Sequence, residues 1–507
     1  MASDFDTLVT EISKLILERE VSKKSKTNKI RRKRTKEEKK TFKQSVRYIL
    51  TVLWQDLNTV PIKESSFNLH QPYYSKNKRY IEHLGLSYRT FKSVYNTLIR
   101  LNYLTITANH VFDLEKSENN KLRQHKPSGY LADRLLGLSE QGSDLHPAIT
   151  ILPDLNRETI ILRNQSKKLQ DYEDTSVTNK FRRQIKKINT VLARHWPDLL
   201  LRDNQWPELE RRLQESNREY LDFSRRTVDR IFSNYNFSDS GRMYRTWWSE
   251  IPNKVEEGSN NLPYRNFITL DGMPTNEIDY AGLGPNIFYA LCNKQIGEAD
   301  PYDRVFDGQH RSMVKLGMNA MIQASTQLGR CPRDNKLKEL LIKADFNSDI
   351  DRAWRYLRKK IKDAHPDVRD YFGQGLGAKI QHEDSNLIIS VMLYYAERDI
   401  PVLPVHDSLL IDWKLSGTRE DLRDQMLMAF EKRFKKSVTV KEEDMFKVRK
   451  PLVELAPFMG LGTTVTSYIS MLEENGNYRR WTSRQRAWLK ALPDIKSKLG
   501  GDKNAEL

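Results

Sequence analysis

Two aspartates that are far apart in the chain end short apolar segments and could bind metal ions. Asp407 lies between the apolar runs 402–405 and 409–411, a pattern that predicts a tight hairpin with its carboxylate at the tip. Asp279 ends the strand predicted to follow Asp271-Gly272, a two-residue hairpin signal. If these strands share one sheet, the two carboxylates can hold a pair of hard divalent cations. An aspartate at a hairpin tip is also a common turn former, so Asp407 alone leaves both interpretations open.

A pair of cations lies between these aspartates in the sequence. Arg311 and Lys315 are four residues apart, which places them on one face of a predicted helix. The other side of that helix is apolar, with Val314, Met318, Met321 and Ile322. Two cations on one face can bind phosphate groups. The simpler interpretation is the solvated face of an amphipathic helix.

Taken in order, four segments resemble the conserved blocks of family A DNA polymerases and of the related single-subunit, phage-type RNA polymerases. The resemblance covers about residues 236 to 415. The segments are Ser240-Gly241-Arg242-Met243 with Ile251-Pro252, Asp279-Tyr280 as motif A, Arg311 with Lys315 as the start of motif B, and Val405-His406-Asp407-Ser408 as motif C.

The resemblance implies an α+β fold: a mostly helical chain with an antiparallel-sheet palm, a helical thumb and helical fingers. It implies nucleotidyl transfer with two Mg²⁺ ions, for which Mn²⁺ is a possible substitute. The implied site residues fall into four groups. They are Asp279, Asp407, Lys315 and Arg311 for catalysis; Asp279, Asp407 and the Tyr280 backbone carbonyl for the metals; Tyr280, Gly284, Arg311, Lys315 and Asn319 for the nucleotide; and Arg242, Gln381 and His406 for nucleic acid.

Three departures from the family pattern concern the type of polymerase. Gln323 stands where the DNA enzymes carry the motif B Tyr, and Ser408 replaces the Glu after the motif C Asp. Gly284 stands where a Glu blocks the ribose 2′-hydroxyl, so we expect poor discrimination against ribonucleotides. The favoured interpretation is a compact DNA polymerase or replicase, which could also act as a primase. The alternatives are a single-subunit RNA polymerase or primase, template-independent end addition, and an inactive DNA-binding initiator or regulator.

The composition predicts a polyanionic partner. The chain has 507 residues, a net charge of +18 and a pI near 9.5, which points to DNA and possible RNA partners rather than to a membrane. Nucleoside triphosphates are the expected small-molecule substrates, and the oligomeric state is not predicted. Cys292 and Cys331 lack metal-ligand spacing and suggest a reducing, cytoplasmic setting. The first residues lack the pattern of a signal peptide.

The N-terminal part is divided into a basic arm, residues 1–40, and a winged-helix-like DNA-binding domain, residues 41–150, of which 115–150 are a connector. The arm begins with a short amphipathic helix over residues 1–20. The pattern predicts three helices, around 46–53, 80–84 and 87–100, with a turn at Gly85 and an N-cap at Ser87 before the third. Two wing strands are predicted to follow, at 103–106 and 110–114. We expect the third helix to read DNA through Arg89, Lys92 and Asn96. A protein-contact module of the same shape is the alternative.

Three further regions complete the predicted organisation. Residues 151–237 are predicted to be a mostly helical, thumb-like region, with a helical connector as the alternative, and 238–460 form the palm and fingers. Residues 461–507 are a basic C-terminal segment. Its Trp481 and Trp488, seven residues apart, could stack on bases or pack as one helix face against the body.

Overall fold

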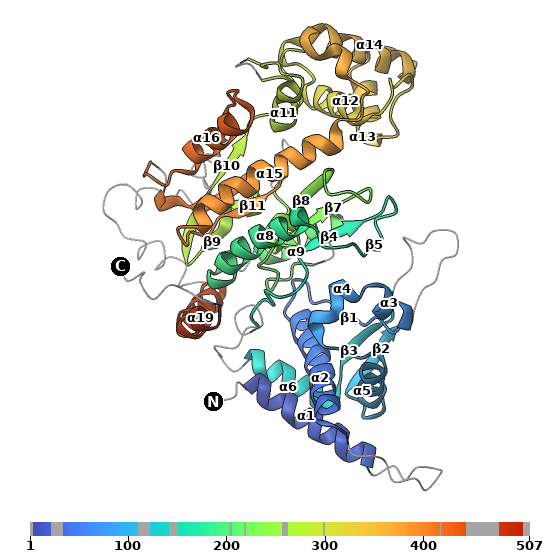
Figure 1. The fold of residues 1–507 in the computed structure, drawn as a ribbon, viewed down its shortest axis with the longest axis vertical. Coiled ribbons are helices and arrows are strands. Elements are labelled where there is room, and N and C mark those ends of the chain that lie inside the picture. The colour runs from blue at the N-terminus through green and yellow to red at the C-terminus, as the bar shows by residue number, and fades with distance from the viewer. Residues whose placement is uncertain are drawn as a thin grey trace.

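The computed structural model describes residues 4–21, 34–109, 122–140, 151–201, 205–216, 220–255, 262–297, 300–415, 417–442 and 476–499. The fold is of the α+β class, with helices predominating over short strands, as predicted. The N-terminal elements lie at one end of an elongated molecule, two small sheets lie in the middle, and a helical lobe lies at the other end (Figure 1). Across the described residues, no helix combines the length and the apolar character needed to cross a bilayer.

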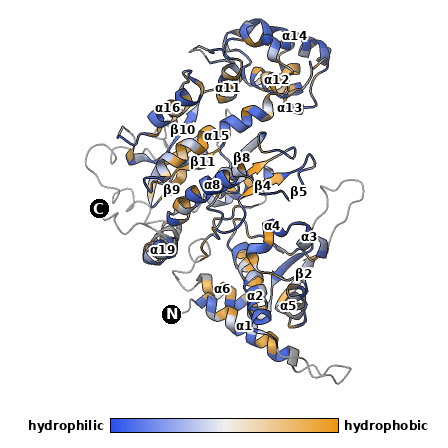
Figure 2. Cartoon of the chain, in the orientation of Figure 1, coloured by the Kyte–Doolittle hydropathy of each residue, from blue (hydrophilic) through white to orange (hydrophobic). Residues whose placement is uncertain are grey.

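The N-terminal elements share one hydrophobic core and one small sheet, and we call them the N-terminal module. In order they are α1 (Asp4–Val21), α2 (Lys36–Leu57), β1 (Ser65–Ser66), α3 (Gln71–Lys76), α4 (Lys78–Ile81), α5 (Tyr88–Arg100), β2 (Leu104–Ala108), β3 (Gln124–Pro127) and α6 (Gly129–Glu140). The sheet is antiparallel throughout, with the order β1-β3-β2. Apolar and polar stripes run along α1, α2 and α6, so one side of each helix packs inward (Figure 2).

Two predicted boundaries in this module are wrong. The predicted helix at residues 1–20 is confirmed, but α1 belongs to the module rather than to a separate arm ending at residue 40, because Leu8 and Ile12 are buried in the same core as α2. The connector predicted over 115–150 contains β3 and α6. The predicted second wing strand, 110–114, lies outside the described residues, and β2 pairs with β3 instead.

Helix α5 has the predicted two faces. Phe91, Val94 and Leu98 are buried, whereas Arg89, Lys92 and Asn96 are exposed. The turn at Gly85 is confirmed, since this glycine has a φ of 60°, a conformation that other residues adopt at a cost. Ser87 is the N-cap residue of this helix, as predicted, but its side chain makes no capping hydrogen bond.

The central sheet of the body brings together strands that are far apart in sequence. Its order is β11 (Leu403–Val405), β12 (Ser408–Asp412), β10 (Met273–Tyr280), β9 (Ile268–Leu270) and β6 (Pro197–Leu199), and β13 (Val440–Glu442) also pairs with β10. Both predicted hairpins are confirmed. In the first, Asp271 and Gly272 adopt positive φ values of 53° and 83°, as a two-residue turn between right-twisted strands requires.

A second sheet contradicts the prediction that residues 151–237 are mostly helical. It has the order β5 (Leu169–Gln170), β4 (Ile160–Arg163), β7 (Asp229–Phe232) and β8 (Ser240–Tyr244), with β4 and β7 parallel. Helices α8 (Ser176–Arg194) and α9 (Trp206–Glu215) are the two long helices described in this region. Arg226 in this region is fully buried, so its guanidinium is not available to a ligand at the surface.

One long helix, α15 (Gly377–Ala396), connects the two sheets. It packs against β8, α8, α11 (Leu283–Leu291) and α16 (Leu422–Phe434). Gln381 lies within its first turns. The helical lobe consists of α12 (Arg311–Gln323), α13 (Asn335–Lys343) and α14 (Ile350–Ala364) (Figure 1).

The last helix, α19 (Gly476–Leu499), packs against the body. Trp488 is buried and stacks on Trp196, with 6.1 Å between ring centroids, and Arg484 pairs with the buried Asp198. Of the two interpretations given for the C-terminal tryptophans, packing is correct for Trp488. The side chain of Trp481 lies outside the described residues.

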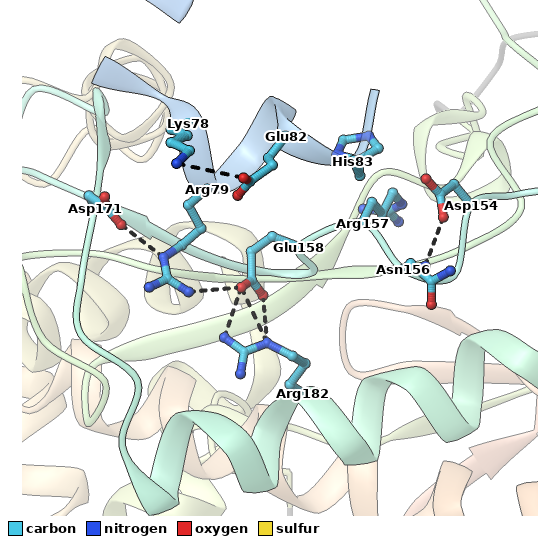
Figure 3. Close-up of a pocket in the computed structure, with 10 residues that line it drawn as sticks. All are labelled: Lys78, Arg79, Glu82, His83, Asp154, Asn156, Arg157, Glu158, Asp171 and Arg182. Atoms are coloured by element: carbon cyan, nitrogen blue, oxygen red, sulfur yellow. Dashed lines mark hydrogen bonds and ion pairs between the residues drawn. The ribbon is translucent and has the colours of Figure 1, made fainter. Parts of the chain in front are cut away.

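The N-terminal module is held on the body by an ionic cluster around Glu158. Arg79 of α4 and Arg182 of α8 converge on this carboxylate, and Arg79 also bonds Asp171 at 2.8 Å (Figure 3). The Arg79 guanidinium lies 4.1 Å from the ring centroid of Tyr172. A cavity of about 570 Å³ lies beside these residues.

A second contact joins the module to the body through the backbone. Val60 and Leu221 exchange two hydrogen bonds, of 3.0 and 2.8 Å. Side-chain bonds across the same junction link Gln55 to Ser224 and Lys63 to Tyr220. The module is thus fixed to the body at two places.

A buried histidine stabilises the turn from which β10 starts. The imidazole of His195 bonds Asp271 through Nδ1 at 2.6 Å, and its Nε2 lies 3.7 Å from Asp399. Burial alone would lower the pKa of His195, but the two carboxylates outweigh burial and raise this pKa to about 9.

The His195 contact makes stability depend on pH. Because the folded pKa lies above the unfolded value of 6.5, the stabilisation is complete below pH 6.5 and is lost as the pH rises through 9. We expect the loss in the free energy of unfolding caused by His195→Asn to be about 3 kcal/mol larger below pH 6.5 than above pH 9. Urea unfolding followed by tryptophan emission measures the difference. His70→Asn, at an exposed position, is the control, and a pH response of His195→Asn equal to that of wild type would contradict the expectation.

Candidate active site

Asp279 lies on β10, and Asp407 lies in the turn directly before β12, the strand that pairs with β10. In the antiparallel register of β10 and β12, Asp279 is opposite Ser408, the residue that follows Asp407. Opposed residues in such a pair have Cα atoms about 5 Å apart, so the two aspartates are neighbours across the strands. Both side chains are half-buried, which leaves them open to solvent or to a ligand. The predicted sharing of one sheet is therefore confirmed.

The hairpin tip presents His406 and Asp407 as its two turn residues. Val405 pairs with Ser408, and His406 has a positive φ of 57°. The imidazole of His406 is exposed and lines a cavity of about 470 Å³ with Arg212, Lys254 and Arg265. A cavity with basic lining residues thus reaches the residue next to Asp407.

The two predicted cations, Arg311 and Lys315, lie near the ring of Tyr302. The guanidinium of Arg311 lies 5.2 Å from the ring centroid of Tyr302, and the Lys315 ammonium lies 6.0 Å from it. The Tyr302 ring is buried, and burial raises its pKa; the charges of Asp300 and Asp407 add to this effect. The tyrosine is thus within electrostatic range of both Asp407 and the cation pair.

Arg311 is already paired with carboxylates of the preceding loop. Its Nη2 lies 2.7 Å from Asp300 and its Nε 3.4 Å from Asp303. Lys441, which is opposite Asp279 in the pairing of β10 with β13, lies 3.6 Å from Asp300. Burial favours the neutral form of Asp300, but the hydrogen bonds from Arg311 and from the Tyr302 N–H, with the charges of Arg311 and Lys441, together outweigh burial and lower its pKa.

Arg242 pairs with a buried carboxylate that sequence reasoning did not identify. Its Nε donates to Asp384 on α15 at 2.8 Å, and its Nη2 donates to the same oxygen. The side chain of Asp384 is 3% exposed, and burial raises its pKa to about 7, with a further contribution from Asp407 and opposition from Arg242. Arg242 therefore lies near Asp407. Its guanidinium also stabilises the buried Asp384 carboxylate.

Three consecutive residues of α15 hold the strand that carries Arg242. Besides Asp384, Ser385 donates to the carbonyl of Gly241, and Asn386 accepts from Arg230 at 2.7 Å. Arg230 also donates to the Gly241 carbonyl at 2.9 Å. Gly241 has a φ of 87°, and a Cβ there would lie 2.7 Å from the Phe232 ring. Only glycine fits this position without a shift of its neighbours.

The remaining predicted residues occupy different places around this centre. The Tyr280 side chain is buried and donates to the Met426 carbonyl at 2.7 Å, so only its backbone carbonyl could serve as a ligand. Asn319 continues the helix face of Arg311 and Lys315, two turns along α12. Gln381 is half-buried on α15, and no contact described here brings it to the aspartates.

The donor set fits Mg²⁺ rather than a soft metal. Two carboxylates and one carbonyl are oxygen donors, and Mg²⁺ is commonly bound by one or two carboxylates together with water and substrate phosphate. Within the described ranges, no cluster of three or more His, Cys, Asp or Glu residues forms a metal site. The arrangement can therefore hold Mg²⁺ only together with ligands that a substrate supplies.

Sequence reasoning missed four residues of this site: Asp300, Tyr302, Asp384 and Lys441. Their roles depend on contacts between distant segments, such as the pairing of β13 with β10. Asp384 alone had a local signal, because a charged residue on the apolar face of a helix is usually paired.

Comparisons with known proteins give no relative for this chain. No protein-family model, no curated protein and no solved structure matches it.

The Arg242–Asp384 pair can be tested by a double-mutant cycle. Arg242→Ala leaves the buried Asp384 carboxylate without its guanidinium partner, so we expect a loss of about 3 kcal/mol in the free energy of unfolding. Adding Asp384→Asn removes the buried charge and should recover part of this loss.

The matched control for the cycle is Arg245→Ala, directly after the same strand, whose guanidinium is 49% exposed and lies 3.3 Å from Asp229. We expect it to cost less than about 1 kcal/mol. Urea unfolding of the four variants measures the coupling, and additive effects of Arg242→Ala and Asp384→Asn would contradict it.

Proposed function

We propose that this chain is a nucleotidyltransferase that extends a nucleic-acid strand on a template. The observation that supports the proposal best is the register that pairs Asp279 with Ser408, the neighbour of Asp407, together with Arg311 and Lys315 around the Tyr302 ring, which also feels the charge of Asp407. Carboxylates for metals opposite cations for a triphosphate are what phosphoryl transfer needs. The resemblance to family A and phage-type polymerases, with a palm around β10 and β12 and fingers around α12, gives the same function.

In this proposal the two aspartates bind Mg²⁺ together with the Tyr280 backbone carbonyl. When bound, the ions activate the 3′-hydroxyl and stabilise the charge on the departing pyrophosphate. The protein supplies rigid positions for the carboxylates, because β10 is paired on both sides at Asp279, with Ser408 and with Lys441. A fixed strand needs little reorganisation when charge develops in the transition state.

The cation pair on α12 binds the triphosphate of the incoming nucleotide. Lys315 is exposed, and Arg311 is held by Asp300. An incoming phosphate replaces this carboxylate as a partner of the guanidinium, which fits phosphate oxygens with two parallel hydrogen bonds. Arg311 is therefore oriented before the substrate arrives.

The basic cavity beside His406 is the proposed place for the end of the growing strand. Lys254 is exposed there, and Arg212 and Arg265 belong to the same lining. His406 lies next to Asp407 in the turn, so a strand bound in this cavity ends at the proposed metal site. Arg242, paired with Asp384 near Asp407, lies close enough to this end to contact it.

The N-terminal module is proposed to be a winged-helix DNA-binding domain. The order of its helices and strands agrees with that fold: β1 follows α2, β2 and β3 follow α5, and the three strands form one sheet. The exposed Arg89, Lys92 and Asn96 on α5 present the side chains expected of a helix in the major groove.

One observation favours synthesis with ribonucleotides, and with it the RNA polymerase or primase alternative. Gly284 lies in the first turn of α11, four residues beyond Tyr280, and a Cβ built on it meets no described atom within 4 Å. No side chain at this position excludes a 2′-hydroxyl.

Extension of a labelled primer on a template, with deoxyribonucleotides and ribonucleotides in separate reactions, tests the function. We expect Asp279→Asn and Asp407→Asn each to reduce the rate at least about a hundredfold, because each removes a ligand of the metal pair. Asp412→Asn, at the other end of β12, is the matched control and should retain activity. A wild-type chain that extends no primer with either set, or an Asp407→Asn variant of undiminished rate, would overturn the proposal.

Duplex binding by α5 is tested separately, by anisotropy of a labelled DNA duplex. We expect Arg89→Ala with Lys92→Ala to weaken binding by about tenfold and to reduce its dependence on salt, since each cation contacts a phosphate or a base. Arg134→Ala serves as the control, because this arginine pairs with Glu11 on another face of the module. Equal losses from both variants would contradict a specific role of α5.

A further inference from the structure

Four aromatic side chains form a cluster at the N-terminal end of α12: Phe306, His310, Phe346 and Tyr356. The ring centroid of Phe346 lies 5.1 Å from those of Phe306 and Tyr356 and 5.3 Å from that of His310. We call these four residues the ring cluster. Phe306 and Phe346 are half-buried, whereas His310 is exposed and Tyr356 is 42% exposed. The cluster thus has a packed base and two rings that are open to solvent.

The loop that carries two of these rings has an unusual backbone. Phe306 has a φ of 59°, Asp307 of 50° and His310 of 58°. A bulky residue with a positive φ is rare, because its Cβ crowds the backbone. Such conformations persist where packing enforces them, and they concentrate at sites that bind ligands. Here the strained loop positions the exposed His310 ring directly before Arg311.

Positive charge accompanies the exposed rings. The ammonium of Lys360 lies 5.5 Å from the ring centroid of Tyr356. Arg352 and Lys359 lie one turn away from Tyr356 on α14, on the same face of the helix. Their pairs with Asp349 and Asp363 are exposed, so the carboxylates can be exchanged for other anions at little cost.

We propose that the ring cluster is a binding site for single-stranded nucleic acid. Bases stack on the exposed rings of Tyr356 and His310, and the backbone phosphates contact Lys360 and its neighbours. Unpaired bases offer a flat apolar face to any aromatic ring, so such a site accepts every sequence. The bases of a duplex are already stacked on one another, which makes a duplex a poor ligand here.

The position of the cluster gives the bound strand a role in synthesis. His310 is adjacent to Arg311, so a strand on the cluster runs beside the cation pair. We identify this strand as the unpaired template only on the basis of the proposed function. The binding of single strands does not, and it can be measured without any nucleotide transfer.

The experiment measures the affinity of the full chain for a fluorescein-labelled oligothymidylate by anisotropy, in the absence of nucleotides. Tyr356→Leu removes the ring but keeps an apolar side chain on α14, and Tyr356→Phe keeps the ring. We expect Tyr356→Leu to bind about tenfold more weakly and Tyr356→Phe to stay within about twofold of wild type. Lys360→Gln should lower the slope of log affinity against log salt by about 0.7.

Ile342→Ala, at a 69% exposed apolar position on the neighbouring α13, controls for a general effect of the lobe and should bind as wild type does. A blunt duplex controls for binding elsewhere, and its affinity should be the same for Tyr356→Leu and wild type. Equal affinities of Tyr356→Leu and Tyr356→Phe for the oligothymidylate would overturn the proposal, whether both match wild type or both are weaker. Primer extension that persists after such a result would show that the ring cluster, and not the proposed function, had failed.

Discussion

The candidate site depends on the register of two strands that are separated by more than a hundred residues. Asp279 comes to lie beside Asp407 because Thr275 to Asp279 pair with Asp412 to Ser408 in order. Leu409, Leu410 and Ile411 are all buried, so β12 is covered on both faces. A slip of one residue in this register would move every side chain of β12 to the other face of the sheet. The apolar side chains of β12 would then lose their buried contacts, which makes the slipped register unfavourable. Core packing thus determines where the carboxylates lie.

The same site contains charges that the fold keeps buried. Arg230 is fully buried, and its described contacts are the Gly241 carbonyl, Asn386 and two phenylalanine rings, so burial lowers its pKa to about 9. Such a group is costly unless it holds other parts in place. Here it fixes the strand of Arg242 against α15. Rigid support of this kind keeps side chains near a reactive centre within narrow limits.

Local patterns predicted much of this fold. The Asp271-Gly272 turn, the hairpin at Asp407 and the two faces of α5 follow from turn chemistry and periodicity within a few residues. The strands between residues 156 and 237 were missed, because they are two to four residues long and lie between strongly charged helices. The pairing of Lys441 with Asp279 has no local signal at all. The partners of Arg311 and Arg242 required the tertiary structure for the same reason.

The attachment of the N-terminal module has a consequence for how the chain meets a duplex. Arg79 and Arg182 share Glu158, and Val60 and Leu221 exchange backbone hydrogen bonds, so the module is mounted on the body and not tethered by a loose linker. If α5 binds a duplex as proposed, this attachment holds the duplex at a fixed distance from the aspartates. The number of base pairs between the sequence bound by α5 and the first nucleotide added to the strand would then be constant.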